Sequence, residues 1–285
     1  MILIDFNQIL LSNLFASIGN HHNIDISEDL VRHMFLNSIR ATRKKFHKEY
    51  GEIIICCDSK YSWRKKEFPY YKANRKSDRE SSEIDWNELH RIMDVVRQEL
   101  VEYFPYKIIQ IDGCEADDII GTICQDHGAI VGDGNEKILI VSNDKDFVQL
   151  HTYSNVYQYD PIRSKDIRIS DPENHLLEHI LKGDSGDGIP NILSADNALA
   201  LKIRQKPMTA KRMALFKESL DNLSDEEKER YKRNRKLIDL TFTPNEIKDA
   251  IRKEYDKEKE TGRGYLYKFF MDKKLKNLMS DIQDF

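Results

Sequence analysis

The stretch Lys137–Phe147, KILIVSNDKDF, passes from an apolar run directly into acidic residues. Its four apolar residues, Ile138 to Val141, have the length and composition of a buried strand. Asp144 and Asp146 follow, two positions apart. Three earlier apolar runs end in the same way, and the acids that follow them are Asp5 after Ile2–Ile4, Asp58 after Ile53–Cys57, and Glu115 and Asp117 after Ile108–Ile111. The recurrence predicts four strands with acids at their carboxyl ends.

Helical patterns separate these runs, as they do in βαβ units. We expect helices over Gln8–Ser17, from a cap at Ser27 to Gly51, over about Ile84–Tyr103, and from Glu115 onward. The alternation predicts an α/β fold with a mostly parallel sheet flanked by helices. The carboxyl ends of parallel strands share one edge, where ligands bind in such folds, so acids far apart in the sequence should converge there.

The later part of the chain has a different pattern. Its expected elements are short strands over Asn155–Tyr159 and Ile167–Ser170, a helix over Pro172–Leu181 capped by Asp171, and, from Ile192, helices interrupted at Pro207 and Pro244. We therefore predict a sheet domain over residues 1–182, with an insertion at about residues 60–83, and a helical region over residues 183–285.

A Gly-rich turn adds Asp184 and Asp187 to the acids at the strand ends. Carboxylates crowded on one edge would repel one another unless divalent cations neutralised them. Each acid alone has an ordinary explanation as a helix cap, a first-turn acid or a turn former. Four successive acidic strand ends plus an acidic turn are hard to ascribe to capping alone. We predict a shared metal site for phosphoryl transfer, in which two ions activate water for in-line attack at phosphorus.

The composition is compatible with a nucleic-acid partner. The 285 residues carry 45 Lys and Arg against 49 Asp and Glu, a net charge of −4, so the surface away from the acidic edge can be basic. The four cysteines have no CxxC spacing, which favours buried thiols in a reducing compartment. There is no basic leader and no apolar run long enough to span a bilayer, so we expect a soluble, cytoplasmic chain without a membrane partner.

Two stretches of the sequence are strongly basic. Residues 60–79 hold eight basic residues against two acids, interleaved with five aromatic residues. Such a segment suits phosphates and unpaired bases, although a solvated charged loop has the same composition. It should bury no core of its own and be mobile without nucleic acid. Residues 199–217 contain six basic residues and no acid, and would either follow a duplex backbone or form an exposed helical surface.

Other motifs are weaker. His175 and His179 have helical i, i+4 spacing but no HExxH signature, so a surface pair is expected. Gly132–Gly134 lacks the rest of a dinucleotide fingerprint, and the sequence has no Walker A motif. A nucleotide cofactor is therefore not expected.

Taken in order, the acidic and basic motifs resemble the 5′-nuclease (flap endonuclease) superfamily, and within it the ribonuclease H branch of T-even bacteriophages. The segments that carry the resemblance are Ile4–Phe6, Cys57–Asp58, Tyr70–Arg75, Glu115–Asp118, Ser142–Phe147, Gly183–Pro190 and Ser280–Phe285. The resemblance implies a PIN-like sheet domain, a helical arch over the active site at about residues 60–83, and a helix-hairpin-helix-like region that binds duplex.

The resemblance also implies roles for individual residues. The expected ligands of the first metal ion are Asp5, Asp58, Glu115, Asp117 and Asp144, and those of the second are Asp146, Asp184 and Asp187. The expected catalytic residues are Asp144, Asp146 and the arch residues Lys72 and Arg75, which would contact the scissile phosphate. The expected nucleic-acid-binding residues are Arg64, Tyr71, Lys72, Arg75, Lys202, Arg204 and Lys211, with Tyr71 stacking on a base.

The activity implied is that of a metal-dependent 5′ to 3′ exonuclease and flap endonuclease with RNase H activity on RNA·DNA and DNA duplexes. It would remove primers and flaps in lagging-strand replication, using two Mg²⁺ ions for which Mn²⁺ can substitute. K⁺ binding is doubtful, because Pro190 is followed by Asn191–Ala195 where the superfamily has a Gly-rich potassium turn. A monomer is expected, with single-stranded DNA-binding protein and a sliding clamp as candidate partners.

Two alternatives stay open at this point. A PIN-type endoribonuclease would share the acidic edge without requiring the basic insertion or the long helical half. A non-catalytic DNA-structure-binding protein would use the acids to hold structural cations, although it would have no need to keep every acidic motif.

Overall fold

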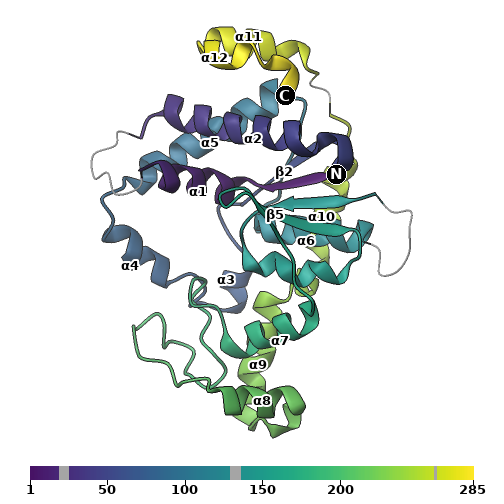
Figure 1. Ribbon diagram of the computed structural model, residues 1–285. Coiled ribbons are helices and arrows are strands. Elements are labelled where there is room, and N and C mark those ends of the chain that lie inside the picture. Colours follow the sequence, from purple (N-terminus) through teal and green to yellow (C-terminus); the bar gives the residue numbers. More distant parts are fainter. Residues whose placement is uncertain (19–25, 129–135, 260–261) are drawn as a thin grey trace.

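The computed structural model describes residues 1–18, 26–128, 136–259 and 262–285, and is built around a six-stranded sheet (Figure 1). The strands are β1 Ile2–Asp5, β2 Ile53–Cys57, β3 Lys107–Gln110, β4 Ile138–Val141, β5 Val156–Asp160 and β6 Lys165–Ile167. Their order is β3-β2-β1-β4-β5-β6, and every pair is parallel except β5 with β6. The predicted α/β class is confirmed. The last strand begins two residues and ends three residues earlier than predicted, because a short turn after β5 brings Lys165 back beside Asp160.

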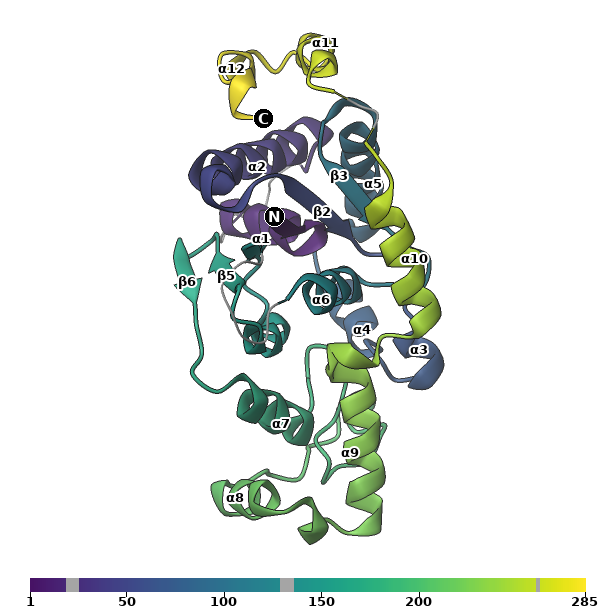
Figure 2. The ribbon, with the colours of Figure 1, turned by 90° about the vertical axis from the view of Figure 1, so that its right-hand side faces the viewer.

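Helices cover both faces of the sheet (Figure 2). The helices of the first half are α1 Phe6–Ile18, α2 Glu28–Tyr50, α3 Arg64–Glu67, α4 Asn74–Glu80, α5 Trp86–Tyr103, α6 Ala116–His127, the 3₁₀ helix η1 Lys145–Thr152, and α7 Pro172–Lys182. Ile2 and Ile4 point into a core with α1, α2 and α5, whereas Leu3 points into the core beneath α6. This alternation follows from the two-residue period of a strand. It also places the buried Cys56 and Cys57 in opposite cores, as predicted.

The predicted helix ends are confirmed where the sequence carried a capping signal. The Ser27 side chain accepts a hydrogen bond from the Leu30 N–H, and Gly51 ends α2 with a φ of 82°. Glu115 and Asp171 stand at the N-terminal ends of α6 and α7. Gly132–Gly134, the segment compared with a dinucleotide fingerprint in the sequence analysis, lies outside the described residues.

The later helices are α8 Ala210–Glu218, η2 Leu220–Asn222, α9 Asp225–Ile238, η3 Leu240–Phe242, α10 Asn245–Asp256, α11 Gly264–Asp272, α12 Lys276–Met279 and η4 Ile282–Asp284. The break at Pro244 is confirmed, since this residue precedes α10. The helix predicted from Ile192 is wrong, because residues 192–209 form turns instead. The Asn191 side chain accepts hydrogen bonds from Leu193 N and Ser194 Oγ, and this local bonding competes with a helix.

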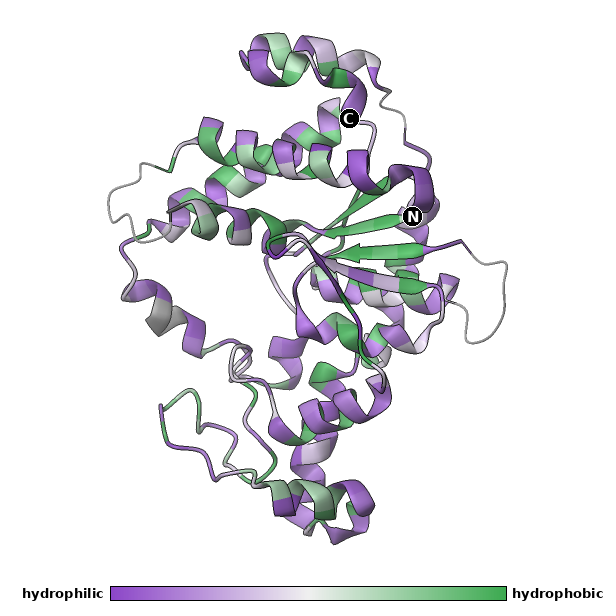
Figure 3. Cartoon of the chain, viewed as in Figure 1, coloured by the Kyte–Doolittle hydropathy of each residue, from purple (hydrophilic) through white to green (hydrophobic). Residues whose placement is uncertain are grey.

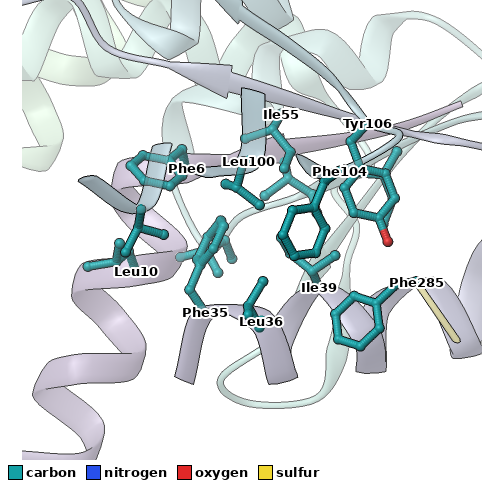
Figure 4. Packing of buried hydrophobic residues seen from close by; sticks show 14 of the residues in the cluster. Phe6, Leu10, Phe35, Leu36, Ile39, Ile55, Leu100, Phe104, Tyr106 and Phe285 are labelled. Carbon is teal, nitrogen blue, oxygen red and sulfur yellow. The ribbon is translucent and has the colours of Figure 1, made fainter. Parts of the chain in front are cut away.

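The helical region packs on the sheet and also forms a lobe of its own. Leu240 and Ile251 join the core beneath α6, and Phe285 lies in the core on the opposite face (Figure 4). Helices α7, α8 and α9 form the lower lobe (Figure 1). In Figure 3 the strands are the most apolar elements, and the outer helices show polar faces to solvent. Within the described ranges, no helix combines the length and apolar character needed to cross a membrane.

The basic segment, residues 60–83, contains the two short helices α3 and α4. Trp63, Phe68 and Tyr71 are buried, but their partners belong to other parts of the chain, which agrees with the prediction that the segment has no core of its own. Phe68 and Tyr71 pack with apolar residues of α7 and α9. The segment therefore relies on the helical lobe for its apolar partners, and composition alone could not show this.

Candidate active site

The predicted acids meet at the carboxyl edge of the sheet. Asp5 ends β1, and Asp58 follows β2. Asn7 Nδ2, one residue into α1, donates to Asp58 Oδ2 at 2.7 Å, and the backbone N–H of Ala116 in α6 donates to Asp58 Oδ1 at 2.8 Å. One carboxylate thus ties together the ends of β1, β2 and the loop that follows β3.

Burial, and then the crowding of these acids, raises the pKa values of several of them. Burial, and then the charge of Asp58, raise the pKa of Asp5 well above its ordinary value. Burial followed by Asp144 and Asp5 has the same effect on the pKa of Asp117, and burial followed by Asp144 raises the pKa of Asp146. The carboxylates therefore form one mutually repelling cluster, which cations would stabilise in its ionised form.

The turn Gly183–Pro190 brings Asp184 and Asp187 to the same cluster. Gly188 has a φ of 70°, and a Cβ there would stand 2.8 Å from the carbonyl oxygen of Tyr70. Asp184 Oδ1 accepts hydrogen bonds from two backbone N–H groups of the turn, at 2.8 and 3.2 Å. The glycine thus lets the turn pack against the basic segment with its carboxylates in fixed positions.

His179 belongs to this cluster, so the prediction of a surface position was wrong. The residue is only 8% exposed, in the last turn of α7. Its Nε2 lies 3.0 Å from Asp184 Oδ2, and its Nδ1 lies 3.6 Å from Asp146 Oδ1. Burial would raise the pKa of Asp184, but hydrogen bonds from His179 and Lys145 hold it below its usual range. Helical spacing could not reveal that this face of α7 packs against η1.

Lys72 and Arg75 face the acids from the basic segment. Lys72 Nζ is ion-paired with Glu115 and lies 3.7 Å from Asp187 Oδ2. Arg75 Nη2 donates to Asp187 Oδ1 at 2.6 Å. Burial would raise the pKa of Glu115, but Lys72 and then Arg64 lower it to about 2. The structure therefore places the basic side chains of Lys72 and Arg75 in ion pairs with two of the predicted metal ligands, Glu115 and Asp187.

Arg64 and Tyr71 are not placed to contact nucleic acid, which corrects the prediction. Arg64 is 3% exposed, and its guanidinium donates to both Asp118 oxygens at 2.9 Å and to Glu115 at 3.0 Å. The buried Tyr71 hydroxyl lies 2.7 Å from Glu115 Oε2 and 2.8 Å from Asp187 Oδ2. Because the polar groups of both side chains are used inside the protein, these residues position the acids.

Asp118 is the centre of a buried network that sequence reasoning did not identify. Besides Arg64, its carboxylate accepts hydrogen bonds from Trp63 Nε1 at 3.2 Å and from Thr243 Oγ1 at 2.8 Å. Its Oδ2 also accepts the N–H of Glu115 at 3.0 Å, which completes a capping box at the start of α6. The network joins the basic segment, α6 and the helical region behind Glu115. The position of Asp118, three residues after Glu115, is typical of a capping box and was the only indication of this network in the sequence.

Lys202, Arg204 and Lys211 lie elsewhere. All three are exposed, the first two in the turns before α8 and the third in α8 itself. The α8 helix lies at the end of the molecule opposite α11 and α12 (Figure 1). The structure therefore assigns these residues to the surface of the lower lobe, away from the acidic edge.

The donor set fits divalent cations. The acids supply oxygen ligands, which Mg²⁺ prefers. Asp146 Oδ1 is buried and has no hydrogen-bond partner among the described residues. Asp146, His179 and Asp184 each offer one ligand atom, and these atoms lie within 4.8 Å of one another. The division of the acids into a first group, Asp5, Asp58, Glu115, Asp117 and Asp144, and a second group, Asp146, Asp184 and Asp187, stays a prediction.

A parallel sheet with converging acids and facing cations defines a class of nuclease, and comparison with known proteins agrees. Residues 1–180 match the family described as the 5′–3′ exonuclease, N-terminal resolvase-like domain, and residues 170–285 match T4 RNase H, C terminal. The chain belongs to the 5′–3′ exonuclease family.

Its relatives are nucleases. The chain is 33% identical to the ribonuclease H of Enterobacteria phage T4, over 99% of this chain and 95% of the relative. It is 26% identical to the flap endonuclease Xni of Shewanella sp. (strain MR-4), over 82% and 84%. Among solved structures, the T5 D15 protein co-crystallised with metal ions covers 90% of this chain and 98% of its own, at 17% identity and a TM-score of 0.61. The zinc-bound T5 5′-exonuclease has the same identity and coverage and a TM-score of 0.62. These structures support the fold.

Proposed function

We propose that the chain is a divalent-metal-dependent 5′ to 3′ exonuclease and flap endonuclease with RNase H activity, acting on RNA·DNA and DNA duplexes. Its role would be the removal of primers and flaps during lagging-strand replication, in the cytoplasm of an infected bacterial cell. The observation that carries the proposal is the pairing of Lys72 and Arg75 with the acids Glu115 and Asp187. The names of the relatives, ribonuclease H and flap endonuclease, support the choice of substrates.

The chain's residues divide the work between holding cations and holding phosphate. Bound divalent cations, two Mg²⁺ ions or Mn²⁺ in their place, would supply charge neutralisation and an activated water at the phosphorus. Glu115 and Asp187, once neutralised, would release Lys72 and Arg75 toward the scissile phosphate. These cations would then stabilise the charge that develops there. Attack by water with departure of the 3′ oxygen leaves a 5′-phosphate.

The substrate would extend beyond the acidic edge. The exposed Lys202, Arg204 and Lys211 would neutralise phosphates of the duplex downstream of the cleavage point. A single chain contains all the named groups, so a monomer suffices. Single-stranded DNA-binding protein and a sliding clamp are the partners expected from the proposed role.

The test compares a 5′-labelled DNA flap, an RNA·DNA hybrid and single-stranded RNA, each incubated with Mg²⁺ or with EDTA. We expect cleavage of the first two substrates only with Mg²⁺, and products that ligate without kinase treatment. Asp144→Asn serves as the inactive control. Cleavage of single-stranded RNA alone would indicate a PIN-type endoribonuclease. Tight binding without cleavage under all metal conditions would indicate a structure-binding protein.

A further inference from the structure

A nitrogen donor, His179, lies beside two of the predicted ligands of the second cation, Asp146 and Asp184. Asp146 follows β4 in η1, His179 lies in the last turn of α7, and Asp184 follows in the turn after it. One ligand atom from each residue lies within 4.8 Å of the other two. Three donors, from η1, from α7 and from the turn that follows α7, thus lie close together, and one of the donors is an imidazole.

The environment of His179 differs from that of a histidine that only caps a helix or fills a core. Both of its ring nitrogens face carboxylate oxygens, at 3.0 Å from Asp184 and 3.6 Å from Asp146. Asp146 Oδ1, which faces the ring, is buried without a hydrogen-bond partner in the described part of the chain. A buried acceptor of this kind is costly to leave unpaired. A cation between the imidazole and the two carboxylates would satisfy it.

Lys145 does not prevent such a cation from binding. Its Nζ lies 2.8 Å from Asp184 Oδ2, but its side chain is 56% exposed. The ammonium can therefore move into solvent on its flexible stem when a metal ion takes its place. The imidazole of His179, with 7% of its side chain exposed, has no such freedom and stays beside the site.

We propose that His179 is a direct ligand of the second cation, and that this position therefore selects a first-row transition metal, Zn²⁺ foremost, over Mg²⁺. Imidazole suits Zn²⁺ at about 2.0–2.1 Å, whereas Mg²⁺ prefers oxygen ligands throughout. The inference rests on the metal site of the proposed function and adds a ligand and a selectivity to it. The first group, which contains only carboxylates among its predicted ligands, would keep the preference for Mg²⁺.

The test measures Zn²⁺ and Mg²⁺ binding to the full chain by titration calorimetry, without substrate. His179→Gln should lower the affinity of one Zn²⁺ site by about 100-fold or more, since even outer-shell partners contribute about 10- to 100-fold. Mg²⁺ affinity should stay the same within error. His175→Gln is the matched control, because this ring lies one helical turn away with its centroid 6.5 Å from that of His179. The control should bind both metals as the unmodified chain does.

A purely positioning role for His179 gives a different result. Glutamine can still donate to Asp184, so His179→Gln would leave Zn²⁺ binding unchanged, and His179→Ala would weaken Zn²⁺ and Mg²⁺ equally. Either outcome would overturn the inference. If His179→Gln fails to fold, spin-echo modulation of Mn²⁺ bound to the unmodified chain decides the matter. A coupling to directly bound ¹⁴N supports the ligand role, and its absence refutes it.

Flap cleavage in Mg²⁺ separates this inference from the proposed function. Zn²⁺ selectivity that depends on His179, in a chain that cleaves no 5′-ended substrate, would contradict the proposed function alone. Metal-dependent flap cleavage together with His179-independent Zn²⁺ binding would contradict the present inference alone.

Discussion

The two sets of carboxylates in the site differ in how their charge is balanced. Asp5, Asp117 and Asp146 are surrounded mainly by other acids, and burial with this repulsion raises their pKa values. Glu115 and Asp184 are equally close to the edge but carry cationic partners, and their pKa values are lowered. We call these the uncompensated and the compensated acids.

The comparison shows two ways of preparing a metal site. The uncompensated acids store repulsion that bound cations relieve. The compensated acids are held in place by Lys72, Arg64, His179 and Lys145 before any metal arrives. A site made only of the first kind would be unstable without metal, and one made only of the second would bind metal weakly.

The largest effect is expected from neutralising an uncompensated acid. Asp117→Asn should lower flap cleavage by about 10³-fold or more, because a metal ligand supplies several kcal/mol of transition-state stabilisation. The same variant should melt at a higher temperature without metal at pH 7. The pKa of Asp117 is higher in the folded than in the unfolded chain, so ionised Asp117 lowers the free energy of unfolding at pH values above the folded-state pKa. This loss of stability disappears as the pH falls below the pKa of Asp117 in the unfolded chain.

Cleavage assays and thermal melting from pH 7 down to pH 4 check both parts. The difference in melting temperature between Asp117→Asn and the unmodified chain should shrink as the pH falls. A lower melting temperature at pH 7 would show that the acid is compensated after all.

The next largest effect concerns the buried support of Glu115. Arg64→Ala would leave Asp118, which is completely buried, without its cationic partner. We expect a loss of about 3–5 kcal/mol in the free energy of unfolding, measured by urea denaturation. Arg75→Ala, which removes a half-exposed arginine from the same segment, should cost less than about 1 kcal/mol. Equal losses would refute a special role for the buried pair.

Removing a cation that faces the acids should affect chemistry more than binding. Lys72→Ala should lower the single-turnover cleavage rate by about 10²- to 10³-fold, because the ammonium would act on charge that develops at the phosphate. The exposed Lys65 of α3 offers the control, and Lys65→Ala should leave the rate unchanged. Parallel losses of duplex affinity and rate would make Lys72 a simple phosphate anchor.

Among the residues that the structure describes, the basic residues of the lower lobe contact neither the uncompensated nor the compensated acids. They should therefore affect the affinity for duplex and not the cleavage rate. Reversing the charge of Lys202, Arg204 and Lys211 together should flatten the salt dependence of duplex binding by about one log–log unit per lost contact. The control reverses Lys48, Lys253 and Lys268, which are exposed on α2, α10 and α11. Equal slopes for both triple variants would exclude the lower lobe from duplex binding.

The smallest expected effect is that of K⁺. The residues after Pro190 form turns held by the Asn191 side chain, whose Nδ2 donates to the Lys206 carbonyl at 2.8 Å. With this altered turn, exchanging Na⁺ for K⁺ at fixed ionic strength should leave duplex affinity unchanged. Fluorescence anisotropy checks this, and a K⁺-specific gain would place an ion site in the turn.

The uncompensated acids could be predicted from the sequence, but the partners of the compensated ones could not. Asp5 and Asp146 come at or soon after the ends of apolar strands, and parallel strands bring their ends to one edge whatever the rest of the chain does. His179 and Arg64 acquire their roles only when α7 packs on η1 and α3 packs on α6. Local spacing contains no information about these contacts, so His179 was expected on the surface and Arg64 at a nucleic-acid contact. The turns at 192–209 escaped prediction for a related reason, since side-chain hydrogen bonds of Asn191 displaced the expected helix.

The burial of Phe285 has a consequence for how the chain folds during synthesis. Ile2 of the central strand and Phe285 belong to one core, in which Phe285 packs against Phe104 and Phe270 (Figure 4). Contacts between residues so far apart in the sequence raise the contact order, and a higher contact order slows folding. At ribosomal speeds, residue 285 follows residue 2 by roughly 15 to 60 s. For that time this face of the sheet lacks its last aromatic layer, and the apolar residues that Phe285 will cover stay exposed.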